Sequence, residues 1–371
     1  MKASKLIYIA VLFCALPAYP SVTVNEDSTV TFCYCGDGRQ VYVQGDFLYE
    51  GEDSTRYSDL RIRRVKMHKQ SDGCFHATLR PVQSETYTYS FRINGKHKTD
   101  PFNNDTVWQT IHKWNILTVD GAPHVRLYDQ PALQGTLLRT CWNSSAEGLC
   151  RRVNIYLPAG YDEANDQSPI TNGKYPVLYL IHGINGYEGS WAERGRAIQI
   201  LENLVAEGVC EPMILVMPDV NVGVHEDRPS HHTLLNNVFS YPRLCHDHDI
   251  EKALVELVQM VDSTYLVSDK HYIVGFSDGA RLAANTANLL PGYFSSVGLF
   301  SPVVHKDQLP KDSAMYYIYT GQRDMFHGNA KRFNRRMDKA QAPHEYTETI
   351  GGHTWRNWRL YLSDYMVKIH Q

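Results

Sequence analysis

One serine in the sequence has a setting that suits covalent catalysis. Residues 275–279 are Gly-Phe-Ser-Asp-Gly and match the pattern G-x-S-x-G. The pattern alone is weak, because it arises by chance in roughly one chain in eight of this length. Its context is stronger, since the apolar segment HYIVG precedes it and the helical segment ARLAANTANLL follows it. A strand, a sharp turn and a helix would expose the hydroxyl, so Ser277 is predicted to be a nucleophile.

A serine hydroxyl becomes a useful nucleophile only when a neighbouring base takes its proton. In strand–turn–helix hydrolases an acid and then a histidine follow the serine along the chain. Asp324 comes after the apolar segment MYYIYTG, and His353 comes after Gly351-Gly352 and a predicted strand at 344–350. Each of the three residues thus follows a predicted strand, in the required order. We predict that His353 is the base and that Asp324 orients its imidazole.

The oxyanion formed during acyl transfer requires two hydrogen-bond donors. We expect one to be the backbone N–H of Asp278 and the other the N–H of Ile184, in the glycine-containing loop 182–186 after the strand VLYLIH. The Asp278 carboxylate would oppose the negative charge if it pointed inward. Alternatively, it faces the N-terminus of the following helix, where negative charge is favoured.

Tryptophans adjoin two of these loops. Trp355 follows His353 by two residues, and Trp191 ends the segment after the oxyanion loop. Aromatic faces stack on sugars and on phenolic groups, so both residues are predicted to bind substrate. Trp358 is assigned to the core instead, because it lies one helical turn from Leu362.

The segments that would position these residues alternate between buried strands and amphipathic helices. Continuous apolar runs at 178–181 and 213–217 predict strands buried on both faces. Apolar stripes at 197–205 and 250–261 have helical spacing. This alternation predicts a largely parallel sheet with helices on both faces, an α/β fold over residues 125–371. Residues 22–120 instead show period-two alternation between turn signals, which predicts a small β-sandwich.

Several segments of the C-terminal region resemble the esterase-D-like enzymes, in particular carbohydrate esterase family one, the feruloyl and acetyl-xylan esterases. They are LYLIHGINGYEGSW (178–191), RAIQILENLVAEGVCEPMILVMPD (196–219), the serine motif, Asp324 and GGHTWRNWRLYL (351–362). The resemblance covers about residues 133–370. It implies an α/β-hydrolase domain with Ser277, Asp324 and His353 as triad. It also implies hydrolysis of ester groups on plant cell-wall polysaccharide or oligosaccharide, such as xylan, without a cofactor.

The sequence departs from that family within the serine motif. Family members usually have G-x-S-M-G-G, whereas Asp278 and Ala280 stand in two of those positions here. The departure leaves the substrate range open. In the N-terminal region, VYVQGDF (41–47), YTYSFRINGK (87–96) and DPFNND (100–105) resemble early-set immunoglobulin-like domains. That resemblance implies either sugar binding or a spacer.

The composition is that of a globular protein with a packed core. The 371 residues are 43% hydrophobic and 21% charged, and the formal net charge is −3. This balance does not favour a nucleic-acid partner. Residues 1–20 resemble a secretory signal peptide, because Lys2 and Lys5 precede an apolar run at 6–16. We therefore expect export to the periplasm or medium, with no membrane span.

Export favours disulfides among the cysteines that follow the signal segment. Cys141 and Cys150 flank a predicted hairpin loop and are expected to bond, and Cys210–Cys245 is a second expected pair. Histidines at 225, 231, 232, 246 and 248 have spacings that could ligate zinc. The segment has a loop-like composition, and Asp249 suits a helix cap, so no metal is predicted.

Three alternative functions stay open. A siderophore-lactone esterase combines a similar sandwich with the same catalytic fold, and an acyltransferase uses the same triad but excludes water. A non-catalytic polysaccharide-binding protein is the third, against which the three ordered residues Ser277, Asp324 and His353 argue.

Overall fold

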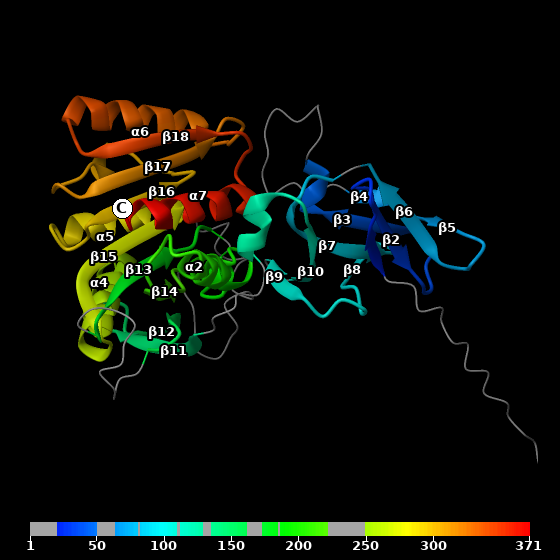
Figure 1. Cartoon of the computed structure of the whole chain (residues 1–371), viewed down its shortest axis with the longest axis horizontal. Coiled ribbons are helices and arrows are strands. Elements are labelled where there is room, and N and C mark those ends of the chain that lie inside the picture. Colours follow the sequence, from blue (N-terminus) through cyan, green and yellow to red (C-terminus); the bar gives the residue numbers. More distant parts are fainter. Residues whose placement is uncertain are drawn as a thin grey trace, which may run out of the picture.

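The computed structural model describes residues 21–49, 64–80, 82–109, 112–128, 135–161, 173–184, 186–221 and 249–371 (Figure 1). The expected signal peptide, the histidine group at 225–248 and Cys245 lie outside these residues. None of the helices in the described ranges is long and apolar enough to cross a membrane.

Residues 21–119, here called the N-terminal sandwich, form two antiparallel sheets. The first has the order β1-β2-β6-β5 and the second β4-β3-β7-β10-β9, with β8 on the edge of β7. Alternate side chains such as Phe32, Val43 and Phe91 point between the sheets and make one core, as the period-two pattern predicts. The strands are β1 Val22–Val24, β2 Val30–Tyr34, β3 Val41–Gly45, β4 Arg64–Lys66, β5 His68–Lys69, β6 Phe75–Leu79, β7 Glu85–Ile93, β8 Lys96–Lys98, β9 Thr106–Gln109 and β10 His112–Val119, with the short helix η1 Asp46–Tyr49.

The C-terminal region is built on one eight-stranded sheet of order β11-β12-β14-β13-β15-β16-β17-β18. The strands are β11 Thr136–Ser144, β12 Leu149–Leu157, β13 Tyr175–Ile181, β14 Ile214–Pro218, β15 Val267–Phe276, β16 Ser296–Phe300, β17 Met315–Gly321 and β18 His344–Thr349. From β14 to β18 all neighbours are parallel, and β11 and β12 form an antiparallel hairpin at one edge. The expected parallel sheet is confirmed.

Helices cover both faces of this sheet, because the central strands are apolar on both sides. Side chains of α4, α5 and α6 build the core on one face, and those of α2 and α7 build the core on the other. The helices are α1 Ser190–Glu193, α2 Ala197–Ala206, α4 Asp249–Thr264, α5 Asp278–Leu289, α6 His327–Ala340 and α7 Trp355–Lys368, with the short helices η2 Pro123–Tyr128 and η5 Lys306–Gln308.

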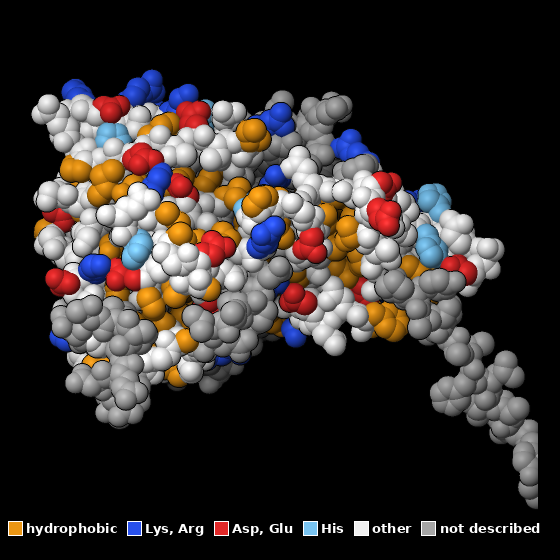
Figure 2. Space-filling view, in the orientation of Figure 1, with side chains coloured by type: hydrophobic (Ala, Val, Ile, Leu, Met, Phe, Trp, Pro, Cys, Tyr) orange, Lys and Arg blue, Asp and Glu red, His pale blue; other side chains and the backbone are white. Residues whose placement is uncertain are grey.

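The helix η2 connects the sandwich to the C-terminal region, and the two parts lie side by side (Figure 1). Acidic and basic side chains are intermixed on the face in Figure 2.

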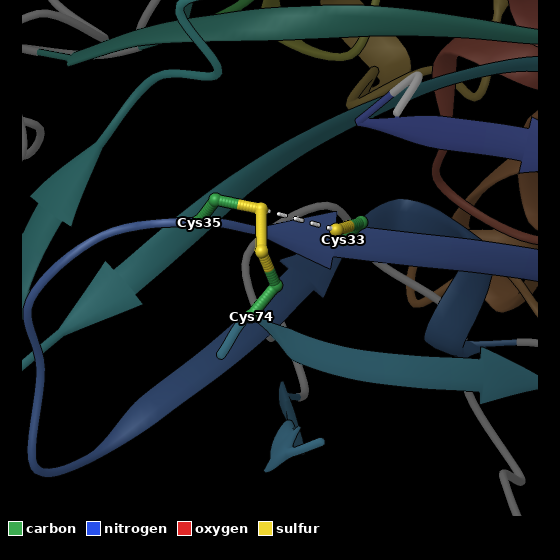
Figure 3. A group of neighbouring side chains, drawn as sticks. All are labelled: Cys33, Cys35 and Cys74. Carbon is green, nitrogen blue, oxygen red and sulfur yellow. Dashed lines mark hydrogen bonds between the residues drawn. A yellow bond between two sulfur atoms is a disulfide. The ribbon is translucent and has the colours of Figure 1, made fainter. Parts of the chain in front are cut away.

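Two disulfides occur among the described residues. Cys141–Cys150 joins β11 to β12 across the hairpin loop, as predicted. Cys35–Cys74, which the sequence did not suggest, joins the residue after β2 to the residue before β6, and the free thiol of Cys33 lies 3.6 Å from the Cys35 sulfur (Figure 3). The second expected pair, Cys210–Cys245, includes a residue outside the described ranges. Cys210 itself is a buried free thiol whose sulfur donates to the carbonyls of Glu211 and Met366.

Candidate active site

Ser277 occupies a strained turn between β15 and α5. Its backbone φ of 57° and ψ of −123° lie in a region that residues other than glycine rarely adopt, and the strain costs about 1–3 kcal/mol. Two glycines allow the turn: a Cβ on Gly275 would lie 2.0 Å from the carbonyl oxygen of Gly279, and one on Gly279 would lie 2.4 Å from that of His182. The Ser277 N–H donates to the Phe300 carbonyl at 2.9 Å, which ties the turn to the end of β16.

The three residues predicted from the sequence meet in one chain of hydrogen bonds. The Oγ of Ser277 lies 3.0 Å from Nε2 of His353. Nδ1 of His353 lies 3.2 Å from both carboxylate oxygens of Asp324. All three side chains are buried beyond the carboxyl ends of the parallel strands β15, β17 and β18 of one sheet. A carboxylate on Nδ1 leaves Nε2 free to accept the serine proton.

The surroundings of Asp324 keep its carboxylate ionised. Burial alone would raise its pKa, but the hydrogen bond and positive charge of His353, a hydrogen bond from Ser301 and the N–H of Phe326 hold the pKa below its usual value. The Phe326 N–H donates to Oδ1 at 2.7 Å. A persistent negative charge at this position would stabilise an imidazolium ion on His353.

The loops that bear Asp324 and His353 are bonded to each other. The N–H groups of Gln322 and Arg323 donate to the carbonyls of Thr349 and Gly351 at 2.8 and 2.9 Å. Gly351 has a φ of 109°, and a Cβ there would lie 2.4 Å from the Asn357 side chain. This pairing fixes the separation between the carboxylate and the imidazole.

Asn357, in the first turn of α7, forms hydrogen bonds with the backbone of the histidine loop. Its Oδ1 accepts from the Gly352 N–H at 3.1 Å, and its Nδ2 donates to the Ile350 carbonyl at 2.9 Å. Thr354 caps the same helix. Nothing in the sequence distinguished Asn357 from an ordinary helical residue, because its role depends on a loop that folds back on the helix.

The loop after β13 lies directly against the serine turn. A Cβ on Gly183 would lie 2.9 Å from the Ser277 Cβ and 3.0 Å from the Phe276 carbonyl, so only glycine permits this approach. Ile184 directly follows Gly183, and Asp278 directly follows Ser277. The two backbone N–H groups expected to form the oxyanion hole therefore belong to two segments that are in contact.

The carboxylate of Asp278 forms an ion pair within the first turn of α5. Arg281 donates to its two oxygens at 2.9 and 3.2 Å and also donates to Glu251 at 3.0 Å. Of the two orientations weighed from the sequence, the one within the helix N-terminus is found. The pair with Arg281 neutralises a charge that would otherwise oppose an oxyanion.

Trp191 and Trp355, which are expected to bind substrate, have little exposed surface. Their side chains are 1% and 5% exposed, and the two rings pack edge to face at 5.4 Å. Both also contact Phe276, the residue before Ser277. Burial of such large apolar rings is favourable in itself, and their contact with substrate stays a prediction.

Two exposed apolar side chains adjoin the candidate residues in the sequence. Met325 follows Asp324 and is 37% exposed, and Ile350 precedes the histidine loop and is 87% exposed. The ring of Phe326 packs edge to face against His353 at 5.2 Å.

A cavity of about 530 Å³ lies between the sandwich and the loop after β13. It does not include the three catalytic candidates. Trp108 of β9 contributes from the sandwich, and the remaining lining residues are Arg139, Thr140, Cys141, Arg152, Asn154, Tyr187, Glu188, Gly189 and Glu193. An indole among polar side chains is a surface that suits a sugar.

Possible metal ligands gather elsewhere in the described residues. Cys33, Cys35 and Cys74 lie within 4.8 Å of one another in the sandwich, but two of them are bonded as a disulfide (Figure 3). They are not part of the serine site.

The sequence analysis also missed a second His–Asp pair at this sheet edge. His182 and Asp219 follow β13 and β14 and are buried, with Nε2 and Oδ1 3.4 Å apart. The Val220 N–H donates to Nε2 at 3.0 Å, and Nδ1 lies 2.8 Å from the Gly183 carbonyl. Both ring nitrogens are therefore engaged by backbone groups.

Comparison with known proteins finds similarity to esterases in the C-terminal region. Residues 144–317, which include Ser277, match the family described as putative esterase. The chain is 28% identical over 311 residues to an endo-1,4-beta-xylanase/feruloyl esterase of Xylanibacter ruminicola, an alignment that covers 80% of this chain and 40% of that protein. The chain thus spans less than half the length of this curated relative.

Solved structures share the fold. The enterochelin esterase of Shigella flexneri is 16% identical, with a TM-score of 0.66 over 94% of this chain and 95% of its own. A CE1 ferulic acid esterase of Anaeromyces mucronatus, determined with ferulic acid, is 21% identical, with a TM-score of 0.52 over 66% of this chain and 95% of its own. Residues 144–317 thus match an esterase family model, and the C-terminal region has the α/β-hydrolase fold.

Proposed function

We propose that this chain is a serine esterase with Ser277 as nucleophile, His353 as general base and Asp324 as the orienting acid. The observation that supports this most directly is the continuous chain from the Ser277 hydroxyl through His353 to Asp324, with bonds of 3.0 and 3.2 Å. The strained turn presents the hydroxyl at the end of β15 and therefore sets the direction of attack.

The reaction proceeds through an acyl-enzyme. Ser277 attacks the ester carbonyl carbon while His353 takes the hydroxyl proton, and the oxyanion accepts hydrogen bonds from the N–H groups of Ile184 and Asp278. The imidazolium then gives its proton to the departing alkoxide, and the carbon–oxygen bond of the ester breaks. Water, deprotonated by His353, then attacks the acyl carbon. The bond from that carbon to the Ser277 Oγ breaks, the imidazolium returns the proton to Oγ, and the acid is released. No cofactor takes part in these steps.

The proposed substrate is a feruloyl or acetyl ester on xylan-type plant cell-wall polysaccharide. Support comes from the 28% identical relative, whose name combines xylanase and feruloyl esterase activities. Met325 and Ile350, which are exposed and adjoin Asp324 and the histidine loop in the sequence, offer apolar surface that suits an aromatic acyl group. The cavity beside Trp108 offers a place for sugar residues next to the oxyanion loop.

A siderophore-lactone esterase is the second candidate, and one observation favours it. The enterochelin esterase structure matches both the sandwich and the C-terminal region, whereas the ferulic acid esterase structure matches 66% of the chain. Because the two sequences are only 16% identical, the similarity supports a shared architecture more than a shared substrate.

Domain bounds of 22–120 and 125–371 and export of the chain are part of the same proposal. The two disulfides among the described residues support export, because disulfides persist in oxidising compartments.

A hydrolysis panel tests the proposal. Purified protein is assayed with methyl ferulate, acetylated xylan and a catecholate lactone, alongside the Ser277→Ala variant. We expect methyl ferulate to be cleaved best and Ser277→Ala to lose the activity on every substrate. Faster cleavage of the lactone would select the second candidate. Activity above a few per cent in Ser277→Ala, together with no labelling of Ser277 by a fluorophosphonate, would contradict both.

A further inference from the structure

A buried ion pair joins the N-terminal sandwich to the last helix of the C-terminal region. Glu85, the first residue of β7, is 0% exposed, and Arg359 of α7 is 4% exposed. Nη2 of Arg359 donates to the Glu85 carboxylate at 2.8 Å and to the Thr86 carbonyl at 2.6 Å. Two charges removed from water at such an interface are costly unless they are paired and hydrogen-bonded.

The same guanidinium reaches two further parts of the interface. Its Nη1 donates to the carbonyl of Arg194 at 2.8 Å, and its carbon lies 5.0 Å above the ring of Tyr128 in η2. Arg356, one turn earlier on α7, approaches the other oxygen of Glu85 at 3.7 Å. A planar, multidentate guanidinium fixes both the position and the rotation of the helix that bears it.

The residue beside Arg359 on α7 contacts the surroundings of all three catalytic candidates. The Trp358 ring stacks on Phe276, next to Ser277, at 4.0 Å and meets the His353 ring edge to face at 5.0 Å. Its indole N–H donates to the Ser301 hydroxyl at 3.0 Å, and Ser301 hydrogen-bonds Asp324. A small rotation of α7 would therefore shift the serine turn, the imidazole and the carboxylate relative to one another.

We propose that Glu85 is a positioning residue of the esterase site: by holding Arg359, it fixes α7 and thereby the alignment of Ser277, His353 and Asp324. The inference rests on the proposed function, because it assigns a role in that reaction. The sandwich then acts as part of the catalytic scaffold in addition to any contact with substrate. Glu85 itself touches neither the nucleophile nor the substrate.

The test compares two carboxylate-to-amide changes in the full chain. Glu85→Gln removes the charge that faces Arg359. Asp100→Asn is the matched control, because Asp100 is 2% exposed in the same sandwich and accepts a hydrogen bond from Tyr89 at 2.6 Å. We measure kcat and KM for methyl ferulate, the rate of Ser277 labelling by a fluorophosphonate, and Tm.

In Glu85→Gln we expect kcat and the labelling rate to fall about tenfold with KM within about twofold, since misplacement of about 1 Å can cost up to a hundredfold in rate. In Asp100→Asn, both rates should stay within about twofold of the parent at temperatures well below Tm. Equal rates in the two variants would overturn the proposal. The labelling rate reports on Ser277 even if methyl ferulate is not the substrate, so failure of the proposed substrate is distinguished from failure of this inference.

A double variant separates alignment from stability. Glu85→Leu/Arg359→Met leaves no unpaired buried charge, and such replacements often restore or raise stability. We expect its Tm to exceed that of Glu85→Gln while its kcat and labelling rate stay low, because the bonds from Arg359 to Thr86 and Arg194 are absent. Recovery of the rates together with Tm would show that the pair contributes stability alone. If Glu85→Gln does not fold, this variant decides the question.

Discussion

Two His–Asp pairs lie at the same edge of the eight-stranded sheet, yet their second nitrogens face different groups. In His353–Asp324 the imidazole Nε2 faces the Ser277 hydroxyl at 3.0 Å. In His182–Asp219 the nitrogen that faces away from the carboxylate is Nδ1, which lies 2.8 Å from the Gly183 carbonyl, while Nε2, beside Asp219, accepts the Val220 N–H at 3.0 Å. An imidazole whose two nitrogens are bound by backbone cannot exchange a proton with substrate. The comparison shows that a buried acid beside a histidine does not define a catalytic pair; the third partner does.

Replacing each histidine by alanine is the sharpest test of this distinction. His353→Ala should lower kcat roughly 10⁴–10⁶-fold with little change in KM, because no other base faces Ser277. Steady-state kinetics on the best substrate of the panel measure the effect. A loss of less than about a hundredfold would mean that another group takes the Ser277 proton.

Replacing each aspartate by asparagine should likewise lower kcat far more at Asp324 than at Asp219. Asp324→Asn should lower kcat roughly 10³–10⁴-fold, because an amide at this position favours the wrong tautomer of His353. Asp219→Asn should change kcat only a few-fold, since its partner is fixed by backbone groups. Equal losses in the two variants would place Asp219 in the proton pathway.

His182→Ala should act on stability more than on chemistry. The change leaves the Val220 N–H and the Gly183 carbonyl without their partner, which costs about 1–3 kcal/mol of unfolding free energy. Because the loop also contains Ile184, kcat should fall by up to about tenfold. Urea unfolding and kinetics on one preparation check both values, and intact stability combined with abolished turnover would refute the assignment.

The smallest expected effect is on the pH dependence of stability below about pH 4. Burial would raise the pKa values of Asp324 and Asp219, but their histidine neighbours and hydrogen bonds hold both pKa values below normal. A depressed carboxyl pKa contributes stability that is present above the unfolded value of about 3.9 and is lost as pH falls through the folded value. The gap in unfolding free energy between the parent and either Asn variant should therefore narrow below about pH 4. Urea titrations at pH 7, 5 and 3.5 measure it, and a gap that widens on acidification would contradict the depressed pKa values.

Local patterns predicted much of the fold and all three members of the hydrogen-bonded chain. Ser277 and Asp324 each follow a strand whose apolar run is visible in the sequence, and His353 follows the strand predicted at 344–350. Carboxyl ends of parallel strands meet at one edge, so chain order alone brings such residues together. The hairpin disulfide Cys141–Cys150 was predictable for the same reason, because both cysteines flank one short loop.

The burial of the tryptophans could not be read from the sequence in this way. Trp191 and Trp355 lie near catalytic residues along the chain, but the side from which a ring approaches depends on how α7 packs on the sheet. The same packing gives Asn357 and Ser301 their partners. Contacts between elements far apart in the chain leave no local pattern, because each residue alone would fit many environments equally well.

The sequence by itself determined the order of strands and helices, the turn that exposes Ser277 and the residues that could complete its site. Hydrophobic periodicity and glycine placement act on neighbouring residues, so they can be recognised in the linear sequence. Only the tertiary structure decided which His–Asp pair faces the serine, where the Asp278 charge is neutralised and that Glu85 reaches Arg359 from 274 positions away. Those outcomes depend on burial and on charge pairing across elements, which only the folded chain creates.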